Sequence, residues 1–388
     1  MIDVARAVVK VLRRVLLELW IQPLQNVLRI TSEGHAPVHR LLNWALVPPK
    51  DFGWLLMTLG RVNVKRLEGA EWSVTYIGED YTHSEKELHH VLFSDRPRVS
   101  QVDRVFIWQV PGMMLQLLEE ADMLVCEVNR LIRWQPRGTK LLFRSPPWVR
   151  MELDVSCPIN EIMARIAGTR RQDLRRAQEQ GFTYALSRAP ADLNLFYHEM
   201  YVPHILSRHQ ERAIIEPFEA KQAMFRRGGL IVVKYEGEPV AAALGHTVGD
   251  TFVLGSVGVH HKHFDLIKKG VTIALYWYTI EWARQNGLRH VDFGMTRPRF
   301  HDGVFWAKQR WGMQVRPYLL NHTHWLFIAQ DPPTPLRRFL NEAGFIAESY
   351  DGYRCVVFEG EVACPGGRDL ARMEKAARQA GLEGLLIL

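Results

Sequence analysis

Three strand-like segments in the second half of the chain are the feature that most restricts its fold. They are rich in aliphatic and β-branched residues, and short turns that contain glycine and acidic residues separate them. Segments of this length joined by such turns predict an antiparallel meander. The three segments are Leu230–Tyr235, Pro239–His246 and Thr251–Val259. The flanking sequence therefore has to fold around a three-stranded sheet.

A helix, a strand and a second helix are predicted after the meander. The apolar stretch Val271–Asn286 predicts a helix, and Arg289–Phe293 predicts a strand. A helix-compatible segment then carries Trp306, Lys308 and Arg310. A helix that begins just past a strand end brings N–H groups and cations to one mouth of a sheet, where an anionic or carbonyl-bearing group can be held. An ordinary strand-loop-helix unit with a solvated basic face explains the spacing equally well.

Composition indicates a folded protein of two domains, because 388 residues with 47% hydrophobic side chains can bury substantial cores. The net charge of +7 and the sequence pI near 9.2 favour anionic partners. Nucleic acid, anionic lipid and phosphorylated ligands all satisfy that preference.

The cysteines and histidines predict no metal site, and no bound cofactor is expected. The chain has four cysteines without a CxxC pair, which argues against a zinc site and a disulfide framework and favours a reducing cytoplasm. The run His260-His261-Lys262-His263 lacks a nearby carboxylate or cysteine that would complete a coordination shell. The cysteines are Cys126, Cys157, Cys355 and Cys364.

Residues 1–60 are predicted to form an amphipathic helical segment. Between residues 4 and 21, apolar side chains share one helical face and basic side chains lie opposite, and the basic residues break the run that a membrane-spanning helix needs. Two interpretations remain open. Residues 1–22 lie on an anionic membrane surface, or they dock on the protein's own core. The first would make this cytoplasmic protein peripheral on the inner membrane face.

Residues 61–150 predict a first α/β domain, because short strand-like runs alternate there with polar loops and one helical interval. Residues 321–388 are interpreted as an appended C-terminal α/β segment. Neither region offers a recognisable set of catalytic side chains.

The segment Asn160–Gln180 predicts one arginine-rich helix. Arg170, Arg171 and Arg175 project roughly one way and could bind phosphates, although arginines on a helix surface are more often solvated. Arg208 follows a second predicted helix, Ala191–Leu206.

Four sequence motifs, together with their order along the chain, resemble those of the GNAT acyltransferase fold and, within it, of the Fem-type branch. They cover roughly residues 147–318. The motifs are Arg170-Arg171 with Leu174-Arg175-Arg176-Ala177 and Gly181, Gly237-Glu238-Pro239-Val240-Ala241-Ala242, Gly287 with Asp292-Phe293-Gly294, and Lys308 with Trp311-Gly312. Two departures stand out. Ala307 replaces the aromatic residue usual before the lysine, and the phosphate-cradling loop is reduced to Lys268-Lys269-Gly270.

This resemblance implies a mixed α+β, GNAT-like fold in residues 151–320, with residues 61–150 as a degenerate first GNAT-like half. Fem-type enzymes are aminoacyl-tRNA-dependent ligases that build peptidoglycan cross-bridges. The resemblance therefore implies transfer of an acyl or aminoacyl group to an amine.

The same resemblance nominates the catalytic residues. Lys308 would stabilise charge at the carbonyl or on a ribose leaving oxygen, and Asp292 would orient Lys308 or Arg310, or only cap the next turn. Backbone N–H groups near Gly255–Gly258 would polarise the carbonyl. His260 is a candidate base, although a solvated loop histidine is the commoner case.

Further residues are nominated for binding. Lys268 and Lys269 would contact donor phosphates at a helix N-terminus, and the arginines of Asn160–Gln180 would contact an anionic acceptor or RNA. The full binding set is Arg170, Arg171, Arg175, Arg208, Gly258, Lys268, Lys269, Gly270, Trp306 and Arg310.

Three function classes follow. The first is a Fem-like transferase that uses aminoacyl-tRNA and a peptidoglycan or other envelope precursor, lipid-linked or free, as the amine acceptor. The second is an N-acyltransferase that uses a thioester of coenzyme A or acyl carrier protein. The third is a non-catalytic GNAT-fold binding module.

Overall fold

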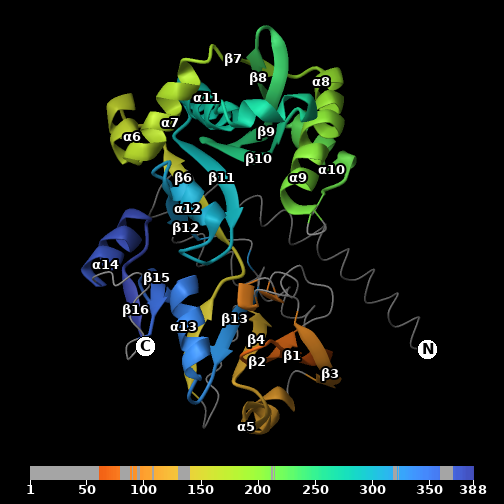
Figure 1. Ribbon diagram of the computed structural model, residues 1–388, viewed down its shortest axis with the longest axis vertical. Helices are drawn as coiled ribbons and strands as arrows, with labels where there is room; N and C mark the ends of the chain where they lie inside the picture. The colour runs from red at the N-terminus through yellow and green to blue at the C-terminus, as the bar shows by residue number, and fades with distance from the viewer. Residues whose placement is uncertain are drawn as a thin grey trace, which may run out of the picture. The chain divides into compact units, whose positions relative to one another are not determined.

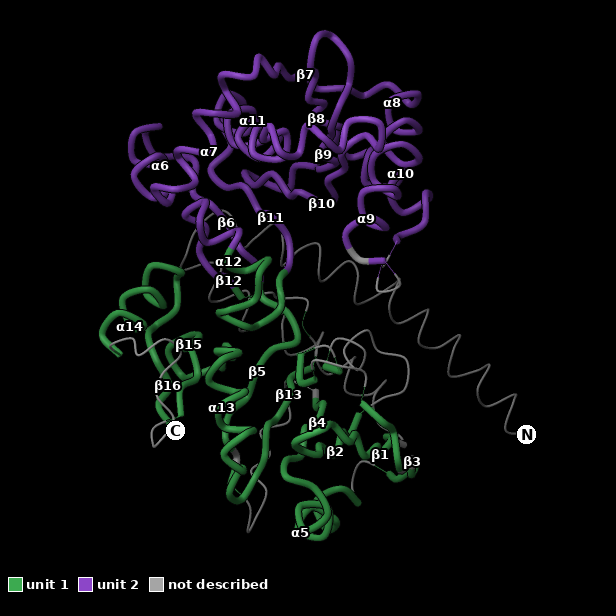
Figure 2. The backbone as a smooth tube through the Cα atoms, viewed as in Figure 1, with its two compact units in different colours: residues 1–149, 296–306, 317–388 green, residues 150–295, 307–316 purple. Residues whose placement is uncertain are grey.

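The computed structural model describes residues 61–78, 88–89, 91–93, 97–106, 109–129, 140–210, 213, 215–317, 321, 323–358 and 370–388. The chain divides into two units (Figure 2). Unit 1 comprises Met1–Val149, Thr296–Trp306 and Pro317–Leu388, and unit 2 comprises Arg150–Met295 and Ala307–Arg316. The predicted N-terminal helix and Cys364 lie outside the described residues. Within the described residues, no helix is both long and apolar enough to cross a membrane.

Unit 1 is built on a six-stranded sheet with the order β3-β1-β2-β4-β13-β5. Figure 1 labels all of these strands except β5, which is labelled in Figure 2. Apolar side chains cover both faces of this sheet, and helix α5 (Val110–Glu120) packs on one of them. The strands are β1 (Arg61–Glu68), β2 (Ser73–Gly78), β3 (Arg98–Phe106), β4 (Met123–Asn129), β5 (Leu141–Ser145) and β13 (Thr323–Ile328).

Strand β13 lies inside this sheet, although almost two hundred residues separate it from β4 in sequence. It pairs antiparallel with β4 through Thr323–Asn129 to Ile328–Leu124, and with β5 on its other side. Residues 321–388 therefore do not form a separate appended segment, in contrast to the sequence-based expectation. Local patterns identify a strand but do not reveal a partner so distant in the chain.

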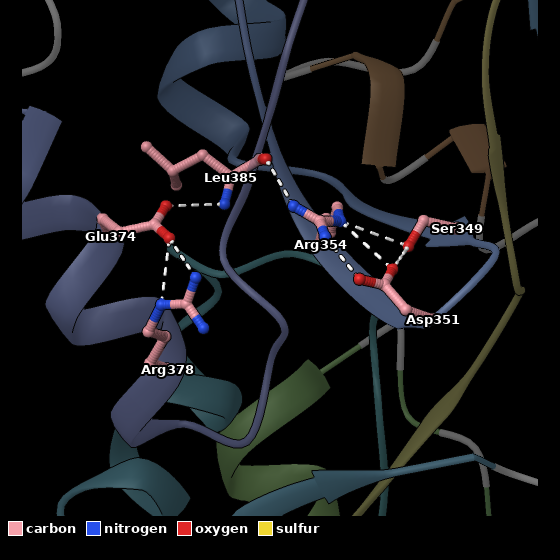
Figure 3. A network of polar contacts seen from close by, with 6 residues as sticks. All are labelled: Ser349, Asp351, Arg354, Glu374, Arg378 and Leu385. Atoms are coloured by element: carbon pink, nitrogen blue, oxygen red, sulfur yellow. Dashed lines mark hydrogen bonds and ion pairs between the residues drawn. The ribbon is translucent and has the colours of Figure 1, made fainter.

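A second, three-stranded sheet completes unit 1, with the order β14-β15-β16. Figure 3 shows the polar network that ties it to its helix: Arg354 of β15 contacts Asp351 and Ser349, and Glu374 accepts from Arg378 and from the backbone N–H of Leu385. The elements are α13 (Thr334–Ala343), β14 (Ile346–Ser349), β15 (Gly352–Val357), α14 (Leu370–Gln379) and β16 (Leu385–Ile387).

Unit 2 is built on a seven-stranded sheet with the order β12-β6-β11-β10-β9-β8-β7. The predicted meander is confirmed as β8, β9 and β10, which pair antiparallel in sequence order. The strands are β6 (Val149–Asp154), β7 (Thr183–Ser187), β8 (Gly228–Tyr235), β9 (Glu238–Val248), β10 (Thr251–Val259), β11 (His290–Thr296) and β12 (Gln314–Arg316).

Helices cover both faces of this sheet. Helix α11 packs against β8, β9 and β10, and α7 packs on α11. The π-helix η3 and helix α10 pack on the opposite face, around Phe196, Met200 and Phe225. The helices are α6 (Ile159–Arg165), α7 (Gly168–Gln178), α8 (Pro190–Leu195), η3 (Phe196–Tyr201), α9 (Val202–His209), α10 (Phe218–Arg226), the 3-10 helix η5 (His261–Ile267), α11 (Val271–Gln285) and α12 (Gly303–Gln309).

The helix predictions hold in part. The helix expected over Val271–Asn286 is confirmed as α11. The single helix predicted over Asn160–Gln180 is wrong, because α6 ends at Arg165 and Ile166 and Ala167 take extended backbone angles before α7. No proline or glycine marks that break, since the glycine comes only at the first residue of α7.

Candidate functional site

The centre of the seven-stranded sheet opens where β10 and β11 stop pairing. Their parallel ladder runs from Thr251–His290 to Val253–Asp292, whereas β10 continues to Val259. Gly255 is exposed, and Ser256 and Val257 are partly exposed, although β10 occupies the middle of the sheet. A central strand is normally covered on both edges, so this exposure marks backbone that β11 has left uncovered.

A β-bulge sits at the start of the exposed stretch. The register between β10 and β9 shifts between Leu254 and Ser256. Gly255 lies at this shift, and a Cβ there would collide with the Met224 side chain. Bulges occur beside active sites, where they re-aim side chains and end strand pairing. Here the bulge turns Ser256 towards the face that carries α10.

Lys221 of α10 reaches this bulge from the protein interior. Only 1% of the residue is exposed, and Nζ donates to Ser256 Oγ over 2.6 Å and contacts the Glu216 carboxylate. Nζ also lies 4.7 Å from the centre of the Tyr201 ring. Sequence reasoning missed this lysine. The available signal was its spacing, because Lys221 falls three residues after Phe218 and four before Phe225, on the buried face of an amphipathic helix.

Two histidines close the far end of β10. The N–H of Val259 donates to His204 Nδ1 over 2.9 Å, so this donor is already occupied. The predicted base His260 accepts at Nδ1 from the backbone N–H of Lys262, over 3.2 Å. Burial lowers the pKa of His260, and His261 and His263 lower it further. The structure thus places His260 as a helix cap that favours its neutral form.

Asp292 stands at the last position of β11 that pairs with β10. Its Oδ2 lies 2.8 Å from Arg150 Nη2, and its Oδ1 accepts from the backbone N–H of Gly294. Arg150 also contacts Glu152 over 2.8 Å. The two contacts of Asp292 pair it with Arg150 and make it the cap of the next turn, which is the second of the two roles expected for it. Burial and the nearby Asp292 raise the pKa of Glu152, and Arg150 opposes them.

Lys308 lies beside the end of β11, as the sequence suggested. The residue is 8% exposed, and Nζ donates to the backbone carbonyls of Gly294 and Met295 over 2.9 Å each. Gly294 has a φ of 78°, which suits glycine and turns the strand at this point. Lys308 therefore ties the last residues of β11 to helix α12.

The N-terminus of α11 forms the third part of the site. Gly270 is its cap with a φ of 91°, and a Cβ there would lie 3.0 Å from Ala177 Cβ of α7. Lys268 precedes it, and Lys269 Nζ lies 5.4 Å from the centre of the Tyr235 ring. The first N–H groups of a helix of fifteen residues favour an anion, and the adjacent lysines add charge.

The arginines nominated for phosphate binding have mostly internal partners. Arg170 lies 5.5 Å from the centre of the Trp311 ring, and burial and Arg310 lower its pKa. Arg171 donates to the carbonyls of Met163 and Ile166 and so closes the end of α6.

Other nominated residues differ in how accessible they are. Arg310 donates to Thr169 Oγ1 over 2.7 Å. Arg175 and Arg208 are exposed, and 54% of Trp306 is exposed on α12. Gly258 packs against η3, because a Cβ there would lie 2.7 Å from backbone atoms of Met200 and Tyr201.

Residues 166–301 fit the family model of the acetyltransferase (GNAT) domain, and all of them up to Met295 belong to unit 2. Most of unit 2 therefore fits a GNAT domain. The matched range includes the meander, the bulge, α11 and β11, so the GNAT resemblance noted in the sequence is confirmed. The sequence matches no curated protein at a significant level. Among the described residues, no group of histidine, cysteine and acidic side chains could hold a metal ion.

Solved structures similar to the chain include the crystal structure of FemX, with a TM-score of 0.37, 12% identity, and coverage of 69% of this chain and 83% of that one. Another is the C-terminal domain (DUF2156) of a putative lysylphosphatidylglycerol synthetase from Agrobacterium fabrum. Its TM-score is 0.35 at 11% identity, and the match covers 72% of this chain and 87% of that one. A third is L-PGS from Bacillus licheniformis, with a TM-score of 0.34, 14% identity, and coverage of 71% of this chain and 83% of that one. Likeness at this level carries no information on donor or acceptor.

Proposed function

We propose that unit 2 transfers an acyl or aminoacyl group from an activated donor to an amine, and that the donor carbonyl lies against the exposed edge of β10. The observation that carries this proposal is the early end of the β10–β11 ladder, beyond which Gly255 is exposed and Ser256 and Val257 are partly exposed in the middle of the sheet. Fixed N–H groups along such an edge polarise a carbonyl and stabilise the oxyanion formed on attack.

The N-terminus of α11 would hold the phosphate-bearing part of the donor. The N–H groups of its first turn, which begins at Val271, and the side-chain charge of Lys268 would face a phosphate. Coenzyme A and the 3′ end of a charged tRNA both carry phosphates. The proposal therefore names a phosphate-bearing activated ester or thioester as the donor class.

Within that class, we propose aminoacyl-tRNA and a cell-envelope amine, on the basis of the Fem-type motifs around Arg170 and Lys308. The acyl-thioester alternative is supported by the internal contacts of Arg170 and Arg171, which leave fewer arginines for RNA. Binding to tRNA should weaken steeply with salt, because each contacted phosphate releases counterions.

A transfer assay separates the donors. The full chain is given a pool of charged tRNA and a muramyl pentapeptide whose third residue carries a free side-chain amine, with and without ribonuclease. Parallel reactions contain acetyl-coenzyme A or acyl carrier protein thioesters. Ribonuclease-sensitive transfer supports the aminoacyl reading, and ribonuclease-insensitive transfer from a thioester replaces it. Absence of transfer from every donor would leave a non-catalytic binding module.

We further propose that the reaction takes place at the inner membrane face. This rests on the basic amphipathic pattern of residues 1–22, whose apolar side would insert while Arg6, Lys10 and Arg13 meet lipid headgroups. Flotation with vesicles of phosphatidylglycerol and phosphatidylcholine tests it. The full chain should float and a chain lacking residues 1–22 should not. Aggregation of the shortened chain, with no flotation of the full one, would assign this segment to the core.

A further inference from the structure

Lys221 is a cation that the proposed function does not yet use. Its side chain is 2% exposed, and it is among the largest fully buried side chains of the described residues. Burying a charge is costly unless it is paired and hydrogen-bonded. Its contacts therefore indicate what the lysine is placed there to do.

The partners of Lys221 are a carboxylate and the face of an aromatic ring. The Glu216 carboxylate contacts Nζ, and the face of the Tyr201 ring lies beside it. Glu216 is held in turn by two tyrosines of η3, since Tyr197 Oη donates to its carbonyl over 3.0 Å and its N–H donates to Tyr201 Oη. A charged ammonium has only donors, so Lys221 can donate to Ser256 but cannot take a proton from it.

Ser256 connects the buried ammonium of Lys221 with the exposed part of β10. Its Oγ accepts from Lys221 and donates to the carbonyl of Gly255 over 2.7 Å. Ser256 is partly exposed, whereas Lys221 is sealed from solvent. A hydroxyl polarised by a buried cation therefore lies on the exposed stretch of β10, at the bulge.

We propose that the Ser256 hydroxyl is a second oxyanion donor, and that Lys221 is the positioning residue that holds and polarises it. This role rests on the proposed function. When the amine nitrogen bonds to the donor carbonyl carbon, the C=O π pair moves onto oxygen, and Ser256 Oγ–H turns from the Gly255 carbonyl to that oxygen. The pair returns as the bond to the leaving group breaks. The surplus amine proton goes to water, the leaving group takes one from water, and Ser256 and Lys221 keep theirs.

This role makes kcat the quantity that changes. Removing one oxyanion-hole donor costs about a hundredfold or more in kcat, because the bond strengthens only in the transition state. Ser256→Ala should therefore lower kcat by about a hundredfold with little change in KM for the donor. Ser256→Thr, which keeps the hydroxyl, should recover most of the loss. Lys221→Met should lower kcat by about tenfold, because it removes the polarising charge and leaves the hydroxyl.

A double variant separates this role from a structural one. If Lys221 acts through Ser256, then Lys221→Met should lower kcat no further in the Ser256→Ala background. Ser187→Ala is the matched control. The Ser187 hydroxyl donates to Asp192 at the distant end of β7, so its loss tests the effect of a missing hydroxyl hydrogen bond on folding alone. Thermal unfolding is recorded for every variant.

The substrates are those of the transfer assay: charged tRNA or acetyl-coenzyme A as donor, and the muramyl pentapeptide as acceptor. An active wild type whose Ser256→Ala variant keeps its kcat overturns the role of Ser256 alone. Equal losses of kcat in Ser256→Ala and Ser187→Ala overturn it as well, as do additive losses for Lys221→Met. A wild type inactive with every donor overturns the proposed function, and this role with it.

Discussion

Two lysines of unit 2 are buried near the point where β10 and β11 separate, and they are held in opposite ways. Lys308, on the β11 side, donates to two backbone carbonyls, those of Gly294 and Met295. Lys221, on the β10 side, contacts the side chains of Glu216 and Ser256. Their exposed fractions are 8% and 1%.

The difference concerns what each cation can do without breaking the fold. Backbone carbonyls cannot turn away from Lys308 unless β11 moves, so that ammonium stabilises the turn even when no substrate is bound. A serine hydroxyl can rotate about one bond. Lys221 can therefore pass its influence to a substrate while its own position stays fixed.

Replacement of Lys308 gives the largest expected effect. If this cation also faces the reacting carbonyl, Lys308→Ala should lower transfer by about a hundredfold, or about 3 kcal/mol in the transition state. The same change leaves two carbonyls without their donor, at about 1 to 3 kcal/mol of folding stability. Steady-state kinetics and urea unfolding measure the two losses.

The two losses need not occur together. Lys375→Ala, which removes an exposed lysine of α14 in the other unit, is the control for lost charge. A Lys308→Ala protein that is less stable but has full turnover per folded molecule would limit Lys308 to the turn and leave Lys221 as the only buried lysine of the pair with a catalytic role.

Replacing Arg150 tests how much the ion pairs beside β11 contribute to the stability of the fold. It bridges Glu152 and Asp292, which are 17% and 5% exposed in their side chains. Arg150→Met should lower the free energy of unfolding by about 2 kcal/mol, less than the roughly 3 to 5 kcal/mol of fully buried pairs, because Glu152 keeps contact with solvent. Urea unfolding measures the change.

Arg316→Met provides the matched comparison for Arg150. Arg316 also approaches Glu152, but at 3.9 Å and with 47% of its side chain exposed, so its loss should matter little. Equal stability of the two variants would show that the Arg150 bridge contributes no more than a surface pair.

The smallest effect is expected at Asp351, in the exposed network of Figure 3. Hydrogen bonds from Arg354 and Ser349 lower the pKa of Asp351 from 3.8 to about 2. A lowered pKa means that this carboxylate stabilises the fold above about pH 4 and loses that contribution as the pH falls towards 2. Asp351→Asn should lower the Tm slightly at pH 6 and leave it unchanged at pH 2. A difference that persists at pH 2 would assign the effect to packing.

The sequence predicted the parts of unit 2 that local pattern governs. The meander appears as β8, β9 and β10, and Val271–Asn286 appears as α11, because alternation and turn chemistry lie within a few residues. The motifs also indicated that Lys308 lies beside the end of a strand and that Gly270 precedes a helix, and both hold in the structure.

The rest of the site depended on long-range contacts. Arg150, at the start of unit 2, pairs with Asp292 more than a hundred residues later in the chain. Ser256 contacts Lys221, which lies on α10, a helix that the sequence did not predict. The roles of the arginines in Asn160–Gln180 could not be predicted for a related reason. Side chains that look solvated by spacing, such as Arg170 and Arg171, are taken up by Trp311 and by the carbonyls of α6. Tertiary packing decides these roles, and spacing along one helix does not record it.

Because β13 lies between β4 and β5, a ribosome completes all of unit 2 before it delivers the strand that closes the sheet of unit 1. Until then the facing edges of β4 and β5 have unpaired N–H and C=O groups, and such edges invite pairing with other chains. A nascent chain that stalls before Thr323 would therefore carry a transferase domain with all its strands beside an unfinished and aggregation-prone sheet. The order of synthesis places the risk of misassembly in the half that folds around the last strand to arrive.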